Sequence, residues 1–159
     1  MDFRTAFDRL ISNEGGYVNN PKDPGGETKF GISKRAYPNV DIANLTREQA
    51  RDIYFADFWD RGQMDQYDGA IAFQVFDAAV NHGIETAIRL MQRAAGVADD
   101  GHIGPVTVAA VKAKSVTDML MLFIAERIDF WRKLSTWPTF GNGWAGRAAT
   151  DLRFAAADG

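Results

Sequence analysis

Two carboxylic acids and a hydroxyl group lie close together in the N-terminal part of the chain. Glu14 stands directly before a Gly-Gly pair, Asp23 follows nine residues later, and Thr28 comes five residues after Asp23. Two carboxyl groups held near each other, in surroundings that can differ, are the minimum equipment for cleaving a glycosidic bond. The spacing therefore makes glycoside hydrolysis the first chemistry to consider.

Each of the three residues has its own predicted role. Glu14 comes at the end of an amphipathic helix, where the helix dipole disfavours negative charge, so it is the better general acid. Asp23 lies in a polar loop that favours its ionised form, which suits it to stabilise a cation or orient a water. The Thr28 hydroxyl could hold that water. Spacing alone leaves an alternative open, in which Glu14 is a surface residue at a helix end and Asp23 belongs to a turn.

Hydrophobic periodicity predicts the elements that must position these residues. The first helix carries apolar residues at i, i+4, i+7 and i+8 from Phe3, with Asp2 as N-cap, and Gly15-Gly16 ends it. Thr46 and Gln49 form a predicted capping box that opens a helix through about residue 61. Further helices are expected at 69–83, at 84–95, from residue 105, at 116–134, and from Trp144 to the end of the chain. Residues 137–143 are expected to break the chain before the last helix.

The predicted fold class is mainly α-helical, a helical bundle with a small irregular or β-hairpin insertion near residues 15–32. Five glycines and two prolines in that segment exclude a long helix there. At 159 residues the chain fits a single domain, 1–159, that buries its core without disulfides or metals.

Several segments resemble glycoside hydrolase family 108, N-acetylmuramidases found largely as phage endolysins. The N-terminal signature of that family is similar to the run from Glu14 to Pro21, with Asp23-Pro24-Gly25-Gly26, Thr28 and Gly31-Ile32. Residues 76–83 are similar to the central helix of the family. Residues 90–94 and 100–107 are similar to its C-terminal predicted peptidoglycan-binding region.

This resemblance implies a lysozyme-like fold and cleavage of the β-1,4 bond between N-acetylmuramic acid and N-acetylglucosamine in bacterial peptidoglycan. It implies that Glu14 is the essential acid and that no cofactor is needed. Glu14, Asp23 and Thr28 are also similar to the Glu, Asp and Thr set of phage T4-type lysozymes. Residues 1–91 would form the catalytic part. Residues 92–159 would form a helical part, and we expect it to pack on the same core rather than to stand apart as a binding module.

Two further residues are candidates for substrate binding. Tyr17 could stack on a sugar ring or pack over the hairpin, and Asn81 could hydrogen-bond an N-acetyl group or cap the central helix. The two histidines have no supporting carboxylates nearby, so we expect surface or loop positions and no metal site. The four tryptophans are expected in the core, with Trp137 the most loop-like.

The composition of the chain limits its possible partners and its possible location. The chain has no cysteine and a net charge of −3, with its acidic excess in residues 1–111, which argues against nucleic acid as a partner. It contains no apolar run of 18 residues and no apolar stretch near its N-terminus, so we expect neither membrane insertion nor a secretory signal. The resulting expectation is a monomer that accumulates in the host cytoplasm and reaches the cell wall through a holin-like pore.

Two other functions stay open from the sequence. A lytic transglycosylase acts on the same bond and needs one glutamate, but it has no use for a water held by Asp23 and Thr28. A non-catalytic wall-binding or secretion-promoting protein could keep the fold without the activity. Substitution of Glu14 separates these, since it abolishes lysis only in an enzyme.

Overall fold

The computed structural model describes residues 1–11, 16–22 and 24–159, and this part of the chain forms two compact units. The N-terminal unit comprises Asp2–Asp57, and the helical unit comprises Phe58–Gly159 together with Met1. The change from one unit to the other falls inside a short π-helical segment, Phe55–Asp60, which directly follows an α-helix.

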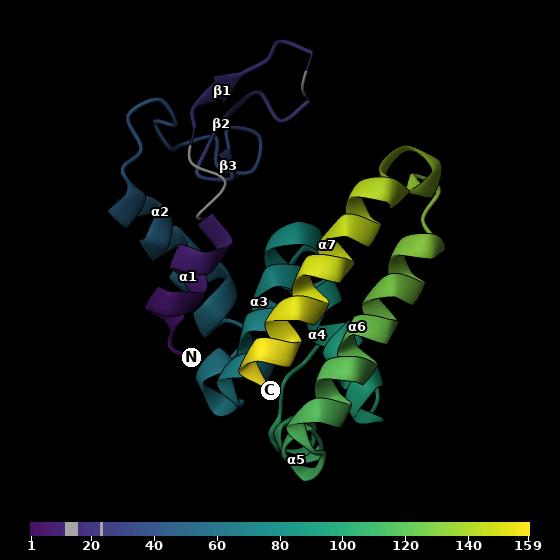
Figure 1. The fold of residues 1–159 in the computed structure, drawn as a ribbon. Helices are drawn as coiled ribbons and strands as arrows, with labels where there is room; N and C mark the ends of the chain where they lie inside the picture. Colours follow the sequence, from purple (N-terminus) through teal and green to yellow (C-terminus); the bar gives the residue numbers. More distant parts are fainter. Residues whose placement is uncertain (12–15, 23) are drawn as a thin grey trace. The chain divides into compact units, whose positions relative to one another are not determined.

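The N-terminal unit combines two helices with a small antiparallel sheet (Figure 1). The helices are α1 (Phe3–Ile11) and α2 (Arg47–Tyr54), and the strands are β1 (Val18–Asn19), β2 (Glu27–Lys29) and β3 (Ile32–Ser33). The strand order is β1-β2-β3, so β2 is the central strand. Its register places Thr28 opposite Val18 on one side and opposite Ser33 on the other.

A tight turn joins β2 to β3. Phe30 has a φ of 52° and Gly31 a φ of 75°, the two positive values that the favoured two-residue hairpin loop requires. Only glycine adopts this conformation freely, and the Tyr54 hydroxyl helps to hold Phe30 there by donating a 2.7 Å hydrogen bond to its carbonyl oxygen. The Tyr54 ring also packs against Phe7 of α1, with 5.6 Å between ring centroids. The hairpin, α1 and α2 therefore share one core.

Both helices of the N-terminal unit begin at the predicted residues. At α1, the Asp2 carboxylate accepts a hydrogen bond of 2.9 Å from the Thr5 amide. At α2, the Thr46 hydroxyl accepts from the Gln49 amide at 3.1 Å, and the Gln49 side chain accepts from the Thr46 amide at 2.9 Å. The capping box read from the sequence is thus confirmed.

The helical unit is built around α3 (Gly69–His82). Three helices pack directly against α3: α4 (Ile84–Ala95), α6 (Val116–Arg132) and α7 (Trp137–Asp158). α5 (Pro105–Ala113) packs against α4, and a short 3-10 turn, Met64–Gln66, precedes α3. Most of α3 is buried, as its apolar residues around the whole circumference predict. In Figure 1, α6 and α7 lie side by side and run in opposite directions.

These observations confirm the predicted fold class, mainly helical with a small β insertion near the N-terminus. The helices expected at 69–83, 84–95 and 116–134 are present, with ends shifted by no more than two residues. Residue 91, where the predicted catalytic part ends, lies within α4. α6 and α7, which follow residue 92, pack against α3, which precedes it.

The prediction that the last helix begins at Trp144 is wrong. α7 begins at Trp137 and continues through Pro138, Gly141 and Gly143 without a break. Pro138 falls in the first turn, where its missing N–H has no helical partner to lose. Gly141 is buried against the indole of Trp137, and a Cβ at this position would lie only 2.6 Å from that ring. The close packing of the Trp137 ring therefore explains why this helical position carries glycine.

Replacing Gly141 by alanine is expected to destabilise the protein by about 1–3 kcal/mol, because the added methyl overpacks the contact with Trp137. Gly143 offers a matched control in the same helix, since a Cβ there meets no atom within 4 Å. Gly143→Ala is expected to raise the free energy of unfolding by up to about 1 kcal/mol through helix propensity. Urea denaturation measures both variants, and effects of the same sign would contradict the packing of Trp137 on Gly141.

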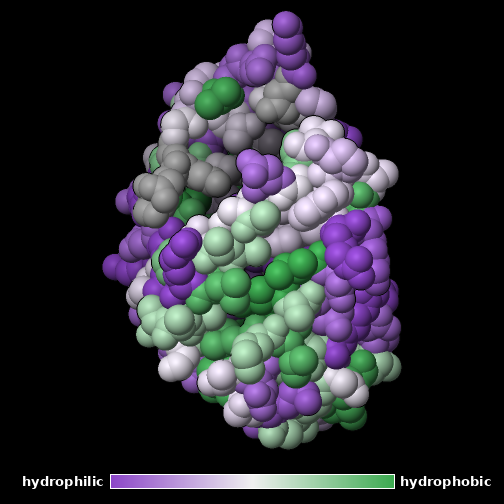
Figure 2. Space-filling view, turned by 45° about the vertical axis from the view of Figure 1, so that its right-hand side comes forward, coloured by the Kyte–Doolittle hydropathy of each residue, from purple (hydrophilic) through white to green (hydrophobic). Residues whose placement is uncertain are grey.

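Part of the apolar surface of the helical unit is exposed. Figure 2 shows hydrophobic residues in a band across the lower half of the view, beside a hydrophilic surface on the right. Near the start of α6 and the end of α7, a groove of about 350 Å³ is lined by Leu120, Met121, Leu152 and Ala155. None of the described helices combines the length and apolar composition that a bilayer-crossing helix requires.

Candidate functional site

Two of the predicted catalytic residues, Glu14 and Asp23, lie outside the residues that the structure describes. In sequence, Glu14 follows the end of α1 by three residues, and Asp23 falls between β1 and β2. The third predicted residue, Thr28, is described. It occupies the middle of the central strand, is partly buried, and is paired on both sides. Two flanking strands therefore fix its backbone.

Tyr17 lies just before β1 with 43% of its surface exposed. Its hydroxyl donates a 2.6 Å hydrogen bond to Glu27 Oε1 on β2, and this bond raises the pKa of Tyr17. The side chain is thus held at its hydroxyl end while much of the ring faces solvent. An exposed, anchored aromatic ring of this kind can stack on a sugar.

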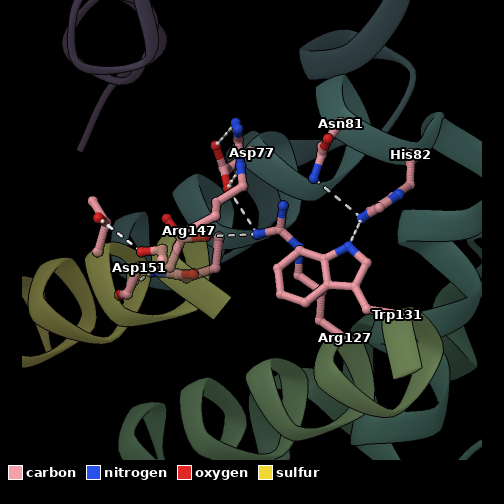
Figure 3. Close-up of polar contacts among 10 residues, drawn as sticks. Asp77, Asn81, His82, Arg127, Trp131, Arg147 and Asp151 are labelled. Carbon is pink, nitrogen blue, oxygen red and sulfur yellow. Dashed lines mark hydrogen bonds and ion pairs between the residues drawn. The ribbon is translucent and has the colours of Figure 1, made fainter. Parts of the chain in front are cut away.

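A buried network of charged side chains joins α3, α6 and α7 (Figure 3). Arg127 Nη1 donates to Asp77 Oδ2 and to Asp151 Oδ2, both at 2.7 Å. Arg147 donates to the other oxygen of Asp77 at 2.9 Å. The Arg127 side chain is 1% exposed, and those of Asp77 and Asp151 are 5% and 4% exposed. Charges this deeply buried persist only when they are paired.

The two carboxyl groups of this network have opposite pKa shifts. Burial opposes the ionisation of Asp77, but Arg127, a hydrogen bond from Asp151 and Arg147 outweigh it and hold the pKa of Asp77 below its usual range. Burial and the neighbouring charge of Asp77 raise the pKa of Asp151 to about 8. Near neutral pH, Asp151 is therefore the protonated partner that donates to Asp77.

Asn81 and His82 lie at the end of α3, beside Trp131 of α6 (Figure 3). Asn81 Nδ2 is 3.2 Å from His82 Nε2, and the indole N–H of Trp131 donates to the same nitrogen. Burial, followed by the positive charges of Arg127 and Arg147, lowers the pKa of His82 to about 4. His82 is therefore neutral at physiological pH.

Trp131 is held between a cation and a second indole. The Arg127 guanidinium lies over its ring, 4.7 Å from the centroid. Trp144 of α7 stacks nearly parallel to it, with 6.0 Å between centroids and 5° between planes. His82 meets Trp131 edge-on at 5.5 Å. These contacts link the charged network to Asn81 through one fixed aromatic ring.

Comparison with known proteins decides the family. The chain matches the model described as Glycosyl hydrolase 108 over residues 7–83. It is also similar to the solved structure of Brucella abortus SagA, with 32% sequence identity, 98% of this chain and 94% of that chain covered, and a TM-score of 0.89. The chain belongs to glycosyl hydrolase family 108. No curated protein shows significant similarity to it.

Membership of glycosyl hydrolase family 108 implies glycoside hydrolase activity, and the resemblance of residues 14–32 and 76–83 to that family is confirmed. The matched range contains every residue predicted for the site, namely Glu14, Tyr17, Asp23, Thr28 and Asn81. Within the described residues, Thr28 lies in β2, and Tyr17 directly precedes β1, whose Val18 pairs with Thr28. Asn81 belongs to the helical unit.

Two expectations about aromatic and imidazole side chains need correction in this family 108 protein. His102 is exposed in the loop before α5 as expected, but His82 is partly buried in a helix and bonded to Trp131. Trp59 and Trp131 are core residues as expected, whereas Trp137 lies in α7 and not in a loop.

A local signal points to one residue of the buried network. Asp77 is a charged residue in the middle of α3, most of whose residues are apolar. A charged residue inside a mostly apolar helix indicates a buried polar contact with another element.

Asp151→Asn is expected to stabilise the protein, and to do so more strongly at pH 9 than at pH 5. The pKa of Asp151 is about 8 in the folded state and about 3.9 in an unfolded chain. The folded state therefore holds the extra proton between these values, so its stability is greatest below about pH 4 and falls as pH rises through 8. Asparagine keeps a donor for Asp77 and an acceptor for Arg127 at every pH.

Thermal unfolding of both proteins at pH 5, 7 and 9 measures this effect. Asp129→Asn is the control, because Asp129 pairs with Arg132 at the surface, where its side chain is 51% exposed. A difference between Asp151→Asn and wild type that does not change with pH would contradict the shared proton.

Proposed function

We propose that the protein is a muramidase that hydrolyses the β-1,4 bond between N-acetylmuramic acid and N-acetylglucosamine in bacterial peptidoglycan. The observation that carries the proposal is the family 108 match over residues 7–83, which spans Glu14, Asp23 and Thr28. The chemical types of these three residues supply an acid, a carboxylate and a hydroxyl for glycoside hydrolysis.

In the proposed mechanism, Glu14 protonates the leaving glycosidic oxygen while positive charge develops at the anomeric carbon. Asp23 stabilises that charge or, together with the Thr28 hydroxyl, orients the attacking water. Attack by that water on the opposite face, with its proton passing to the Asp23 carboxylate, inverts the configuration, which requires carboxyl groups about 6.5–9.5 Å apart. Thr28 is paired with a strand on each side of β2. This pairing supports its role in orienting the water, because a rigid strand places a hydroxyl more reproducibly than a loop does.

We propose sugar-binding roles for Tyr17 and Asn81. The exposed ring of Tyr17, anchored through Glu27, suits stacking against a pyranose face. Asn81 carries both a donor and an acceptor, and so it suits an acetamido group. Peptidoglycan glycan strands carry such groups on both of their sugars.

Digestion of purified peptidoglycan by the wild type, with mass spectrometry of the soluble products, tests the proposed bond. A muramidase leaves N-acetylmuramic acid at the reducing end. Anhydromuramic ends would instead assign the protein to the lytic transglycosylases, and reducing N-acetylglucosamine ends would assign it to the glucosaminidases. No release of fragments would favour a wall-binding or secretion-promoting role.

Release of the protein from the host cytoplasm through a holin-like pore, and its action as a monomer, stay predictions. Fractionation of cells that express the protein with and without a holin checks the first. We expect periplasmic activity only in the presence of the holin, and a periplasmic pool without it would contradict the prediction.

A further inference from the structure

A series of hydrogen bonds that begins at Trp131 and passes through His82 orients the side chain of Asn81. An indole N–H can only donate, so the His82 Nε2 atom that receives it must be an acceptor. The hydrogen of the imidazole ring therefore belongs to Nδ1. Asn81 approaches the same Nε2 atom at 3.2 Å, and only its NH₂ group can interact favourably there.

These donor and acceptor roles fix the direction of the Asn81 amide. With Nδ2 turned toward His82, the carbonyl oxygen Oδ1 is turned away, as Figure 3 shows. Asn81 itself is partly exposed at the end of α3. The result is a hydrogen-bond acceptor of set orientation on a residue that solvent reaches.

Trp131, where this series of hydrogen bonds begins, is itself held firmly. Trp131 is 1% exposed and lies between the Arg127 guanidinium and the Trp144 ring. Arg127 is in turn bound by Asp77 and Asp151 at 2.7 Å each. The indole N–H is thus aimed at His82 by groups from three helices, α3, α6 and α7.

We propose that Trp131 and His82 are positioning residues, which hold Asn81 Oδ1 ready to accept a hydrogen bond from the N–H of a substrate acetamido group. This inference rests on the proposed function, because it names the 2-acetamido sugar as the group that Asn81 recognises. Without the acceptor on His82, the amide of Asn81 is free to rotate and to present its NH₂ group, which cannot accept from that N–H.

The first test separates substrate binding from the chemical step. His82→Leu removes the acceptor and is expected to raise KM for solubilised peptidoglycan about tenfold with kcat unchanged, the size of effect that one neutral hydrogen bond gives. His82→Gln places an amide oxygen near the position of Nε2 and is expected to restore KM. His102→Leu, the same change at the other histidine, is the control and is expected to have no effect.

Rescue by glutamine is the outcome that a merely structural role for His82 would not produce. Circular dichroism and thermal unfolding check that each variant is folded before its kinetics are measured. An unchanged KM in folded His82→Leu, or a lower kcat with the same KM, would overturn the positioning role.

The second test does not depend on catalysis. Nitrogen-15 NMR of the imidazole rings reports which ring nitrogen carries the hydrogen, and His102→Gln assigns the two signals. We expect His82 to carry it on Nδ1 in the wild type, and titration with the trisaccharide of N-acetylglucosamine is expected to shift the side-chain amide signals of Asn81. A hydrogen on Nε2 would overturn the inference.

The two tests distinguish the possible failures. Wild-type hydrolysis of peptidoglycan with no shift of Asn81 by the trisaccharide would overturn the inference and leave the proposed function standing. No hydrolysis by the wild type would overturn the proposed function together with the substrate-binding role of Asn81.

Discussion

Glu14→Gln is expected to lower the rate of peptidoglycan hydrolysis by about 10²–10⁴-fold, the usual contribution of a general acid. Glutamine keeps the size and hydrogen bonding of the side chain but carries no proton that it can transfer to the leaving oxygen. The loss should appear in kcat, because protonation of that oxygen occurs in the transition state. The rate of release of soluble fragments from purified walls measures it.

Glu48→Gln provides the matched control for this experiment. Glu48 lies exposed in the first turn of α2, and the substitution there makes the same chemical change. We expect wild-type activity from this variant. Wild-type activity from Glu14→Gln would remove Glu14 from the mechanism, whereas a loss of activity accompanied by a lower unfolding temperature would point to a structural role.

Arg127→Leu is expected to lower the free energy of unfolding by about 3–5 kcal/mol, the usual result of breaking a buried ion pair from one side. The substitution leaves Asp77 buried, and Asp77 then has only Arg147 as a cationic partner in this network. It also removes the cation from the face of Trp131. The three helices joined by Arg127 are those that form the centre of the helical unit, so the whole unit should lose stability.

Arg132→Leu on the same helix is the control for this prediction. Arg132 pairs with Asp129 at the surface, where the two side chains are 60% and 51% exposed, so less than about 1 kcal/mol should be lost. Urea denaturation of both variants gives the comparison. Similar losses in the two would contradict the energetic importance of the buried network.

The sequence was most informative where a local pattern determines the structure. The N-cap at Asp2, the capping box of Thr46 and Gln49, and the central apolar helix all depend on residues within a few positions of each other. Such signals can be read directly from the chain. α7 begins earlier than the sequence predicts, because Gly141 and Pro138, which read as breakers, are accommodated by the Trp137 ring and by the first helical turn.

The residues of the candidate site also divide into those that local patterns reveal and those that only helix packing brings together. Residue type, short spacing and family resemblance predict Glu14, Asp23 and Thr28 as catalytic residues; the family match covers them, and their roles stay predictions. The network of Asp77, Arg127 and Asp151 was not found, since Arg127 is 50 residues from Asp77 and 24 residues from Asp151. His82 was misplaced for a similar reason, because its partner Trp131 lies 49 residues away. Contacts over such distances depend on how helices pack, which local patterns do not specify.

The measurement that tests the central claim most directly is the identity of the new chain ends when wild type and Glu14→Gln digest the same purified peptidoglycan. We predict reducing N-acetylmuramic acid ends from the wild type and none above background from the variant. Equal yields of these ends from both proteins, or wild-type ends of any other chemical type, would contradict a muramidase that depends on Glu14.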